Sequence, residues 1–140
     1  VEGYRAAALR DSARRRMCET FEYWGIPTVV SLIEVREATK LPVIASGGVR
    51  SGLDVAKSIA LGACLAGVAR PLLRPATVGA ESVRRELEAL ISELKVAMFL
   101  SGARDLGGLR EAPVVIAGFV REWLEARGVD VGRYARRRRG

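Results

Sequence analysis

The chain has 140 residues and a formal net charge of +7, with 49% hydrophobic and 28% charged residues, which is typical of a globular protein. No apolar run is long enough to span a bilayer, and the chain has no histidine, which excludes a histidine base supplied by these residues. The two cysteines, Cys18 and Cys64, form no redox motif, so we expect free thiols, a cytoplasmic location and no membrane partner.

Arginine dominates the positive charge, and the runs 14–16 and 136–139 raise the hypothesis of nucleic-acid binding. No aromatic side chains interleave with these arginines and no nucleic-acid-binding motif is present, so we expect no nucleic-acid partner. The chain also lacks Asn and Gln, which fits a thermophile and equally a GC-rich genome.

The N-terminal part is predicted to be irregular and the segment after it helical. Residues 1–18 are rich in alanine, which favours helix, and in arginine, but no wide apolar stripe appears, and we expect a mobile segment. Residues 28–39 are predicted to form a helix with Thr28 as its N-cap. Its buried side is expected to hold Val29, Leu32, Ile33 and Val35.

The stretch 43–71 predicts a strand, a helix and a second strand. Residues 43–46 are apolar and small, as in a strand that is buried on both faces, and Gly47-Gly48 permits a tight turn after it. A second small and apolar strand is predicted at 65–69, and Arg70-Pro71 stops it. The pattern is that of two consecutive strands of a parallel α/β barrel.

The helix between these strands has signals at both ends. Ser51 is predicted to be its N-cap, with Asp54 in the first turn, where a carboxylate is favoured by the helix dipole. Gly62 is predicted to close the helix as a C-terminal glycine.

Each strand is followed by backbone amides that could hold a phosphate. No side chain shields the amides after Gly47 and Gly48, a helix N-terminus follows them, and further amides follow Ala69. Arg50 and Arg70 lie near the two loops, and a guanidinium offers a flat fork of donors to a phosphate. The alternative is an ordinary crossover in which the glycines serve only the turns.

The C-terminal part is predicted to be helical. Residues 79–101 repeat apolar side chains at helical spacing, and we expect this long helix to pack on the sheet. A short helix and turn are predicted at 103–110 and a last short helix at 117–127. The arginine-rich end, 136–140, is expected to be a solvated, disordered terminus.

Several of these segments resemble one enzyme family. SGGVRSGLDVAKSIALGA (46–63) followed by GVARPLL (67–73) is similar to the flavin-phosphate segment of FMN-binding TIM-barrel enzymes, including α-hydroxy-acid oxidases and type 2 isopentenyl-diphosphate isomerases. ETFEYWGIPT (19–28) resembles the isomerases, as do 94–104 and 112–116. The oxidases need a histidine base near the segment 19–28, and this chain has none.

The resemblance implies an α/β fold, namely the C-terminal segment of an FMN-binding TIM (β/α)8 barrel, about strands 7–8 with helices 6–8. A complete barrel takes about 250 residues, so we expect 1–140 to be a partial domain whose N-terminal part is missing. Its expected parts are 1–27 as a loop region, 28–101 as βα units with phosphate-binding loops, 102–128 as a C-terminal helical extension and 129–140 as a basic tail.

The resemblance also implies an activity. Type 2 isomerases interconvert isopentenyl and dimethylallyl diphosphate in isoprenoid biosynthesis, with reduced FMN and Mg²⁺ and with NADPH as the flavin reductant. Such enzymes are homo-oligomers, commonly tetramers or larger. The family's catalytic and metal-holding residues lie upstream, so we expect neither a catalytic nor a metal-binding residue in this chain, which should be inactive alone. Asp54 is expected to cap its helix and not to bind a metal.

The same resemblance assigns the cofactor site residue by residue. The residues expected to hold the FMN phosphate are Gly47, Gly48, Val49 and Arg50 from the first loop and Ala69 and Arg70 from the second. Two alternatives stay open. One is a segment of another FMN-dependent TIM-barrel oxidoreductase, similar to the 2-hydroxy-acid oxidases. The other is a non-catalytic half-barrel that acts only by assembly with a partner or with itself.

Overall fold

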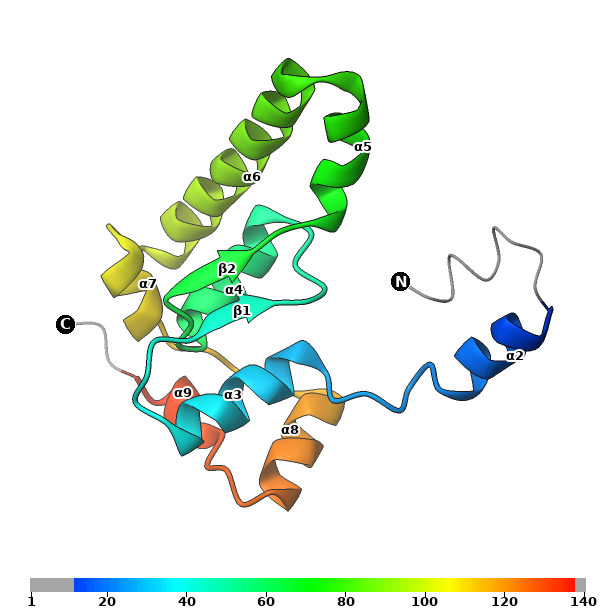
Figure 1. Ribbon diagram of the computed structural model, residues 1–140. Helices are drawn as coiled ribbons and strands as arrows, with labels where there is room; N and C mark the ends of the chain where they lie inside the picture. The colour runs from blue at the N-terminus through cyan, green and yellow to red at the C-terminus, as the bar shows by residue number, and fades with distance from the viewer. Residues whose placement is uncertain (1–11, 138–140) are drawn as a thin grey trace.

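Two parallel strands lie at the centre of the structure, a computed structural model that describes residues 12–137 (Figure 1). In β1 (Ile44–Ser46) and β2 (Leu65–Gly67), Ile44 lies opposite Leu65 and Ser46 lies opposite Gly67. The connecting helix α4 (Gly52–Ala60) packs against β2. The predicted strand–helix–strand unit is therefore confirmed, with shorter strands than predicted. The expectations for residues 1–11 and 138–140 lie outside the described residues.

Helices form most of the remaining described chain. The sequence predicted α3 (Thr28–Ala38), α6 (Ala80–Ser101), α7 (Leu106–Glu111) and α8 (Gly118–Ala126). It did not predict α2 (Ser12–Thr20), α5 (Arg70–Val78) or α9 (Gly132–Ala135). In Figure 1, the hairpin of α5 and α6 extends away from α3, α8 and α9, which cluster on the β1 side of the two strands.

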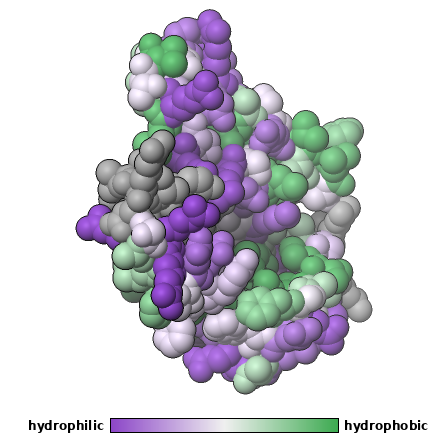
Figure 2. All heavy atoms as spheres, turned by 90° about the vertical axis from the view of Figure 1, so that its right-hand side faces the viewer, coloured by the Kyte–Doolittle hydropathy of each residue, from purple (hydrophilic) through white to green (hydrophobic). Residues whose placement is uncertain are grey.

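The sheet has one covered face and one bare face. Successive side chains of a strand point to opposite faces, and Ala45 is 3% exposed whereas Ile44 is 61% and Leu65 is 59% exposed. Other large apolar side chains are also exposed, and Figure 2 shows them as green patches between polar regions on the face seen there. A strand that is apolar on both faces is typical of a parallel sheet buried on both sides.

The buried side chains form two groups. The first joins α3 and β1 to the C-terminal segment; its buried members are Val30, Leu32, Ile33, Ala45, Leu61, Ala63, Leu124, Val131 and Tyr134. The second joins α4 to α7, and its buried members are Ala56, Ile59 and Leu109, with partly buried side chains of α6 packed against them. The second group packs α4 against α6 and α7, and the first group packs α3 against β1.

The prediction of a loop over residues 1–27 is wrong for residues 12–20, which form α2. This helix buries none of its residues, so tertiary packing does not explain it. Alanine, arginine, methionine and glutamate have high helix propensity, and an ion pair one turn apart joins Arg15 Nε to Glu19 Oε1 at 2.9 Å.

The prediction that Thr28 is an N-cap is also wrong. α3 begins at Thr28, Pro27 holds the N-cap position, and no side chain caps the helix. The Thr28 hydroxyl instead donates to the carbonyl oxygen of Gly47 at 2.8 Å. Val29 and Val35, expected on the buried side, are each more than a third exposed, and Val30 is buried in their place.

The helix that follows β2 was missed. The sequence predicted only that Arg70-Pro71 would end the strand, but Arg70 opens α5. Proline is tolerated in a first helical turn because the amides there have no intrahelical acceptor. The long helix α6 then packs against α4, α5 and α7, and its predicted apolar stripe leaves Leu87 and Ile91 exposed.

Residues 129–137, the described part of the predicted basic tail, contain α9 (Gly132–Ala135) and pack against the rest of the protein. Val131 is 8% and Tyr134 2% exposed, and Arg133 Nη1 donates to Glu37 Oε2 of α3 at 2.8 Å. Arg137 Nη1 donates to the carbonyl oxygens of Ala60 at 2.6 Å and of Arg110 at 2.8 Å. Of the end that was predicted to be solvated, 136–140, Arg136 is exposed as expected, whereas Arg137 is held by backbone carbonyl oxygens.

Candidate phosphate-binding site

The two predicted phosphate loops start at the same edge of the sheet. Because Ser46 pairs with Gly67 in a parallel register, the chain leaves both strands side by side. Residues 47–51 then lead into α4, and residues 68 and 69 lead into α5 (Figure 1). The structure therefore brings together the two loops that the sequence singled out.

The first loop needs glycine for its backbone conformation. Gly47 has a φ of +95° and Gly48 a φ of +78°, both in the left-handed region that favours glycine. A Cβ on Gly47 would lie 3.3 Å from Thr28 Oγ1, whereas a Cβ on Gly48 would meet nothing within 4 Å. Gly48 therefore borders open space in which a ligand could approach the backbone.

A capping box occupies the start of α4. Asp54 Oδ2 accepts from the amides of Arg50 at 3.0 Å and Ser51 at 3.1 Å, and Ser51 Oγ accepts from the amide of Asp54 at 3.1 Å. The amide of Gly52 donates to Glu93 Oε2 of α6 at 2.6 Å. The predicted cap is thus confirmed, but these carboxylates engage the helix N-terminus that was expected to attract a phosphate.

The donors left over in the first loop are few. Within residues 12–137, no hydrogen bond uses the amides of Gly48 and Val49 or the guanidinium of Arg50. Val49 is 7% exposed, so its side chain packs inside and only its backbone could face a ligand. Arg50 could act through its exposed side chain, because its amide is bonded to Asp54.

The second loop adds the positive charge of Arg70 beside the first loop. Ala69 is the N-cap of α5 and its carbonyl oxygen accepts from the amide of Leu72 at 3.0 Å, while Arg70 is the first residue of the helix. Both residues are exposed. Pro71 follows them and has no amide hydrogen, so the side chain of Arg70 is the stronger potential contribution of this loop to anion binding.

The hydrogen bonds at Asp54 change its acidity. Burial raises the pKa of this carboxyl, but the hydrogen bonds from the Arg50 amide and from the side chain and amide of Ser51 outweigh that effect. The pKa therefore lies below its ordinary value of 3.8. A group with a lowered folded-state pKa stabilises the fold above its unfolded-state pKa, and this stabilisation is lost as the pH falls through the folded-state value.

We expect Asp54→Asn to weaken this pH dependence. Asparagine keeps an acceptor oxygen for the cap and does not titrate, so the free energy of unfolding should fall less between about pH 6 and about pH 3 in the variant than in the parent. Urea denaturation at both pH values measures the difference. An identical acid-induced loss in both proteins would contradict the role given to Asp54.

Two residues that touch the first loop were missed by sequence reasoning. Thr28 Oγ1 bonds the carbonyl of Gly47 from 19 residues upstream, and Glu93 bonds the amide of Gly52 from 41 residues downstream. No local pattern points to either contact, because each depends on how distant helices pack against the loop.

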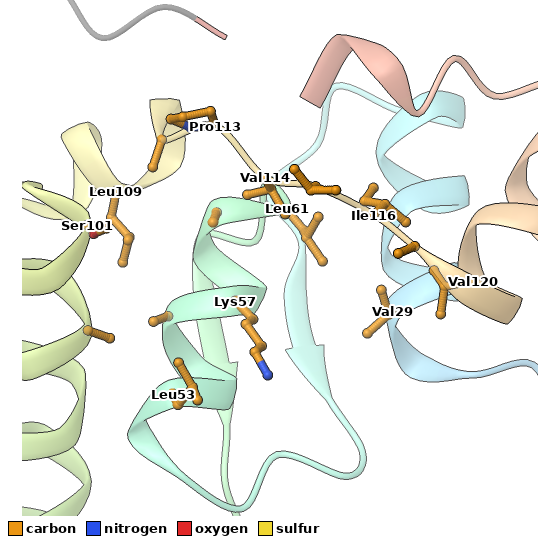
Figure 3. Close-up of a pocket in the computed structure, with 16 residues that line it drawn as sticks. Val29, Leu53, Lys57, Leu61, Ser101, Leu109, Pro113, Val114, Ile116 and Val120 are labelled. Atoms are coloured by element: carbon orange, nitrogen blue, oxygen red, sulfur yellow. The ribbon is translucent and has the colours of Figure 1, made fainter. Parts of the chain in front are cut away.

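A separate apolar cavity of about 360 Å³ lies between α4, α6 and the segment 112–117 (Figure 3). Among the described residues, none of the predicted site residues lines it, and Lys57 is the one ionisable side chain that does. Among the described residues, no group of three or more His, Cys, Asp or Glu could hold a metal ion. No helix within 12–137 has the length and hydropathy needed to cross a membrane.

A model of the FMN-dependent dehydrogenase family matches residues 24–115, which include both loops. The chain therefore belongs to the FMN-dependent dehydrogenase family. This membership confirms the resemblance to FMN-binding enzymes and supports FMN as the cofactor.

Curated relatives narrow the comparison to isomerases. The chain is 51% identical over 140 residues to the isopentenyl-diphosphate delta-isomerase of Thermococcus onnurineus, a match that covers 99% of this chain and 36% of that protein. The enzyme of the same name from Methanosarcina mazei is 52% identical over 131 residues, which cover 94% of this chain and 35% of the relative. The one from Pyrococcus horikoshii is 51% identical over 139 residues, covering 99% and 36%. The chain thus spans little more than a third of the length of these relatives.

Proposed function

We propose that this chain supplies the FMN-phosphate site of a type 2 isopentenyl-diphosphate isomerase whose barrel is completed by residues outside the chain. The observation that carries this proposal is the match, at 51% identity over 99% of the chain, to a curated isopentenyl-diphosphate delta-isomerase. The substrates would be isopentenyl and dimethylallyl diphosphate, and the pathway isoprenoid biosynthesis.

The bare face of the sheet supports a missing barrel. Ile44 and Leu65 expose apolar side chains on the same side of paired strands, where the remaining strands of a barrel would cover them. A two-stranded sheet with open edges is marginal as an independent fold. We therefore assign β1 and β2 to strands 7 and 8, and α3, α4 and α6 to helices 6, 7 and 8 of the complete barrel.

The first loop fits a phosphate group. The amides of Gly48 and Val49 would donate to phosphate oxygens, and the missing Cβ of Gly48 leaves space for that approach. The guanidinium groups of Arg50 and Arg70 would add positive charge from both loops. Gly47 and Ala69 would contribute backbone shape, since Gly47 sets the turn and Ala69 starts α5.

The contribution of this chain to catalysis would be placement of the cofactor. Reduced FMN, when bound, supplies an acid and base for moving a proton between the allylic carbons of the substrate. The loops would anchor its phosphate and so fix the flavin relative to a dry pocket formed elsewhere in the barrel. We assign the Mg²⁺ site, the diphosphate-binding residues and the contact with NADPH to the part outside this chain. Assembly into a homo-oligomer stays a prediction.

The activity is tested in the full-length protein. With reduced FMN and Mg²⁺, isopentenyl diphosphate should be converted to dimethylallyl diphosphate. After a phosphatase has removed the diphosphate groups, chromatography of the two alcohols measures the conversion. Turnover of a 2-hydroxy acid with oxygen would instead support an oxidoreductase. A full-length protein that binds no added FMN would contradict the proposed FMN site.

Gly48→Val should weaken FMN binding by more than about tenfold. Valine disfavours the φ of +78° found at Gly48, and its branched side chain would cover the free amides. Riboflavin has no phosphate, so its affinity should not change. Fluorescence titration of both flavins measures the two dissociation constants.

Gly128→Val is the matched control for this substitution. Gly128 also has a φ of +78°, and a Cβ there would meet nothing within 4 Å, but it follows α8 and lies outside both phosphate loops. The strain is the same and the flavin affinities should be unchanged. Equal FMN affinities of the Gly48 and Gly128 variants would contradict the phosphate assignment.

A further inference from the structure

The carboxylate of Glu93, on α6, reaches the first residue of α4, the helix that follows the first loop. The amide of Gly52, the first residue of α4, donates to Glu93 Oε2 at 2.6 Å. First-turn amides have no intrahelical acceptor, so this bond satisfies a donor that the helix leaves open. Hydrogen bonds from backbone amides to carboxylate oxygens belong to the stronger class in proteins.

Close backbone packing holds Glu93 in this position. A Cβ on Gly52 would lie 2.1 Å from the carbonyl oxygen of Leu90 and 2.5 Å from the amide nitrogen of Leu94, so α4 and α6 meet main chain to main chain. Gly52 is buried, and Glu93 lies between Leu90 and Leu94 on the contacting helix. The contact is therefore a fixed part of the packing between α4 and α6.

We propose that Glu93 is a positioning residue for the FMN-phosphate loop, an inference that rests on the proposed function. Glu93 fixes the amide of Gly52, and Asp54 fixes those of Arg50 and Ser51, whereas the amides of Gly48 and Val49 make no hydrogen bond within residues 12–137. The first loop leads into α4, and the second loop leads into α5 and then α6. The hydrogen bond between Gly52 and Glu93 therefore connects the helix after the first loop to the helix pair after the second.

Charge and positioning predict opposite effects on FMN affinity. A carboxylate beside a phosphate repels it, so loss of the charge alone should strengthen FMN binding or leave it unchanged. Loss of the hydrogen-bond acceptor should weaken FMN binding, because the loop would no longer be held. A pair of neutral side chains that differ only in the acceptor separates the two effects.

Glu93→Gln and Glu93→Met form that pair in the full-length protein. Both are neutral and similar in length, and only glutamine has an oxygen that can accept from Gly52. We expect FMN affinity at or above the parent value for Glu93→Gln and about tenfold weaker for Glu93→Met. Riboflavin affinity should be unchanged in both. Glu86→Met is the control, since Glu86 lies on the same helix and its side chain makes no hydrogen bond or ion pair within residues 12–137.

Two results would overturn the role of Glu93. One is equal FMN affinity in the glutamine and methionine variants, and the other is a parallel loss of FMN and riboflavin affinity, which a merely structural role predicts. If Glu93→Met does not fold, Glu93→Ala takes its place in the same comparison. Failure of the phosphate site itself is distinguishable, because Gly48→Val would then leave FMN affinity unchanged.

Discussion

Gly52→Ala is expected to destabilise the protein by about 3 kcal/mol or more, at the upper end of overpacking effects. The added methyl group would lie 2.1 Å from the Leu90 carbonyl oxygen and 2.5 Å from the Leu94 amide nitrogen. Both contacts are backbone atoms of α6, so no side chain can rotate away and the helices must separate. Urea denaturation of the full-length protein measures the loss.

The control for this substitution is Gly25→Ala. A Cβ on Gly25 would meet nothing within 4 Å, and Gly25 does not have a left-handed backbone conformation. Its free energy of unfolding should change by less than about 0.5 kcal/mol. Equal stabilities of the Gly52 and Gly25 variants would show that α4 and α6 do not touch as closely as described.

Tyr134→Ala is the second substitution with a large expected effect, about 3 to 5 kcal/mol of lost stability by analogy with other buried aromatic residues. Tyr134 is 2% exposed and packs in the group that contains α3 and Leu124. The guanidinium carbons of Arg133 and Arg137 lie 4.9 Å and 4.6 Å from its ring centroid, so the substitution also removes cation–π contacts. Thermal denaturation measures the effect.

Arg136→Ala provides the comparison within the same segment. Arg136 is exposed and pairs with Asp130 at 2.6 Å, and exposed ion pairs contribute about 0 to 1 kcal/mol. The tyrosine variant should therefore lose several times more stability than the arginine variant. Small and equal effects would mean that residues 129–137 behave as a solvated tail and do not pack through Tyr134.

The strand–helix–strand unit was predictable because its signals are local. Gly47-Gly48, the Ser51 cap with Asp54 three residues later, and Gly62 each act within one turn of the chain, and the structure confirms them. The second carboxylate at the start of α4, that of Glu93, has a different basis. Glu93 reaches Gly52 from 41 residues away, which no local spacing encodes.

The C-terminal segment shows a second limit of local reasoning. Its arginines indicated a solvated end at 136–140. Just before that end, Val131 and Tyr134 are buried in the group that also holds Val30, Leu32 and Ile33 of α3, far back in the sequence. Arg137 donates to the carbonyls of Ala60 and Arg110, near the ends of α4 and α7. An arginine side chain that suggests solvation can therefore donate to the free carbonyl oxygens at helix ends when packing places it beside them.

The absence of histidine bears on the choice between reactions. The matched family is named after dehydrogenases, whereas the relatives from Thermococcus onnurineus and Methanosarcina mazei are isomerases. With no histidine among its 140 residues, this chain cannot supply the histidine base of a hydroxy-acid oxidase. Cofactor placement is compatible with either chemistry, and this is why the turnover experiment is needed beside the flavin titrations.

A crystal structure of the full-length protein with FMN tests the phosphate assignment most directly. We predict phosphate oxygens within about 2.7 to 3.2 Å of the amide nitrogens of Gly48 and Val49, with the guanidinium groups of Arg50 and Arg70 turned toward them. A phosphate bound elsewhere in the barrel, with those two amides bonded within the protein, would contradict it.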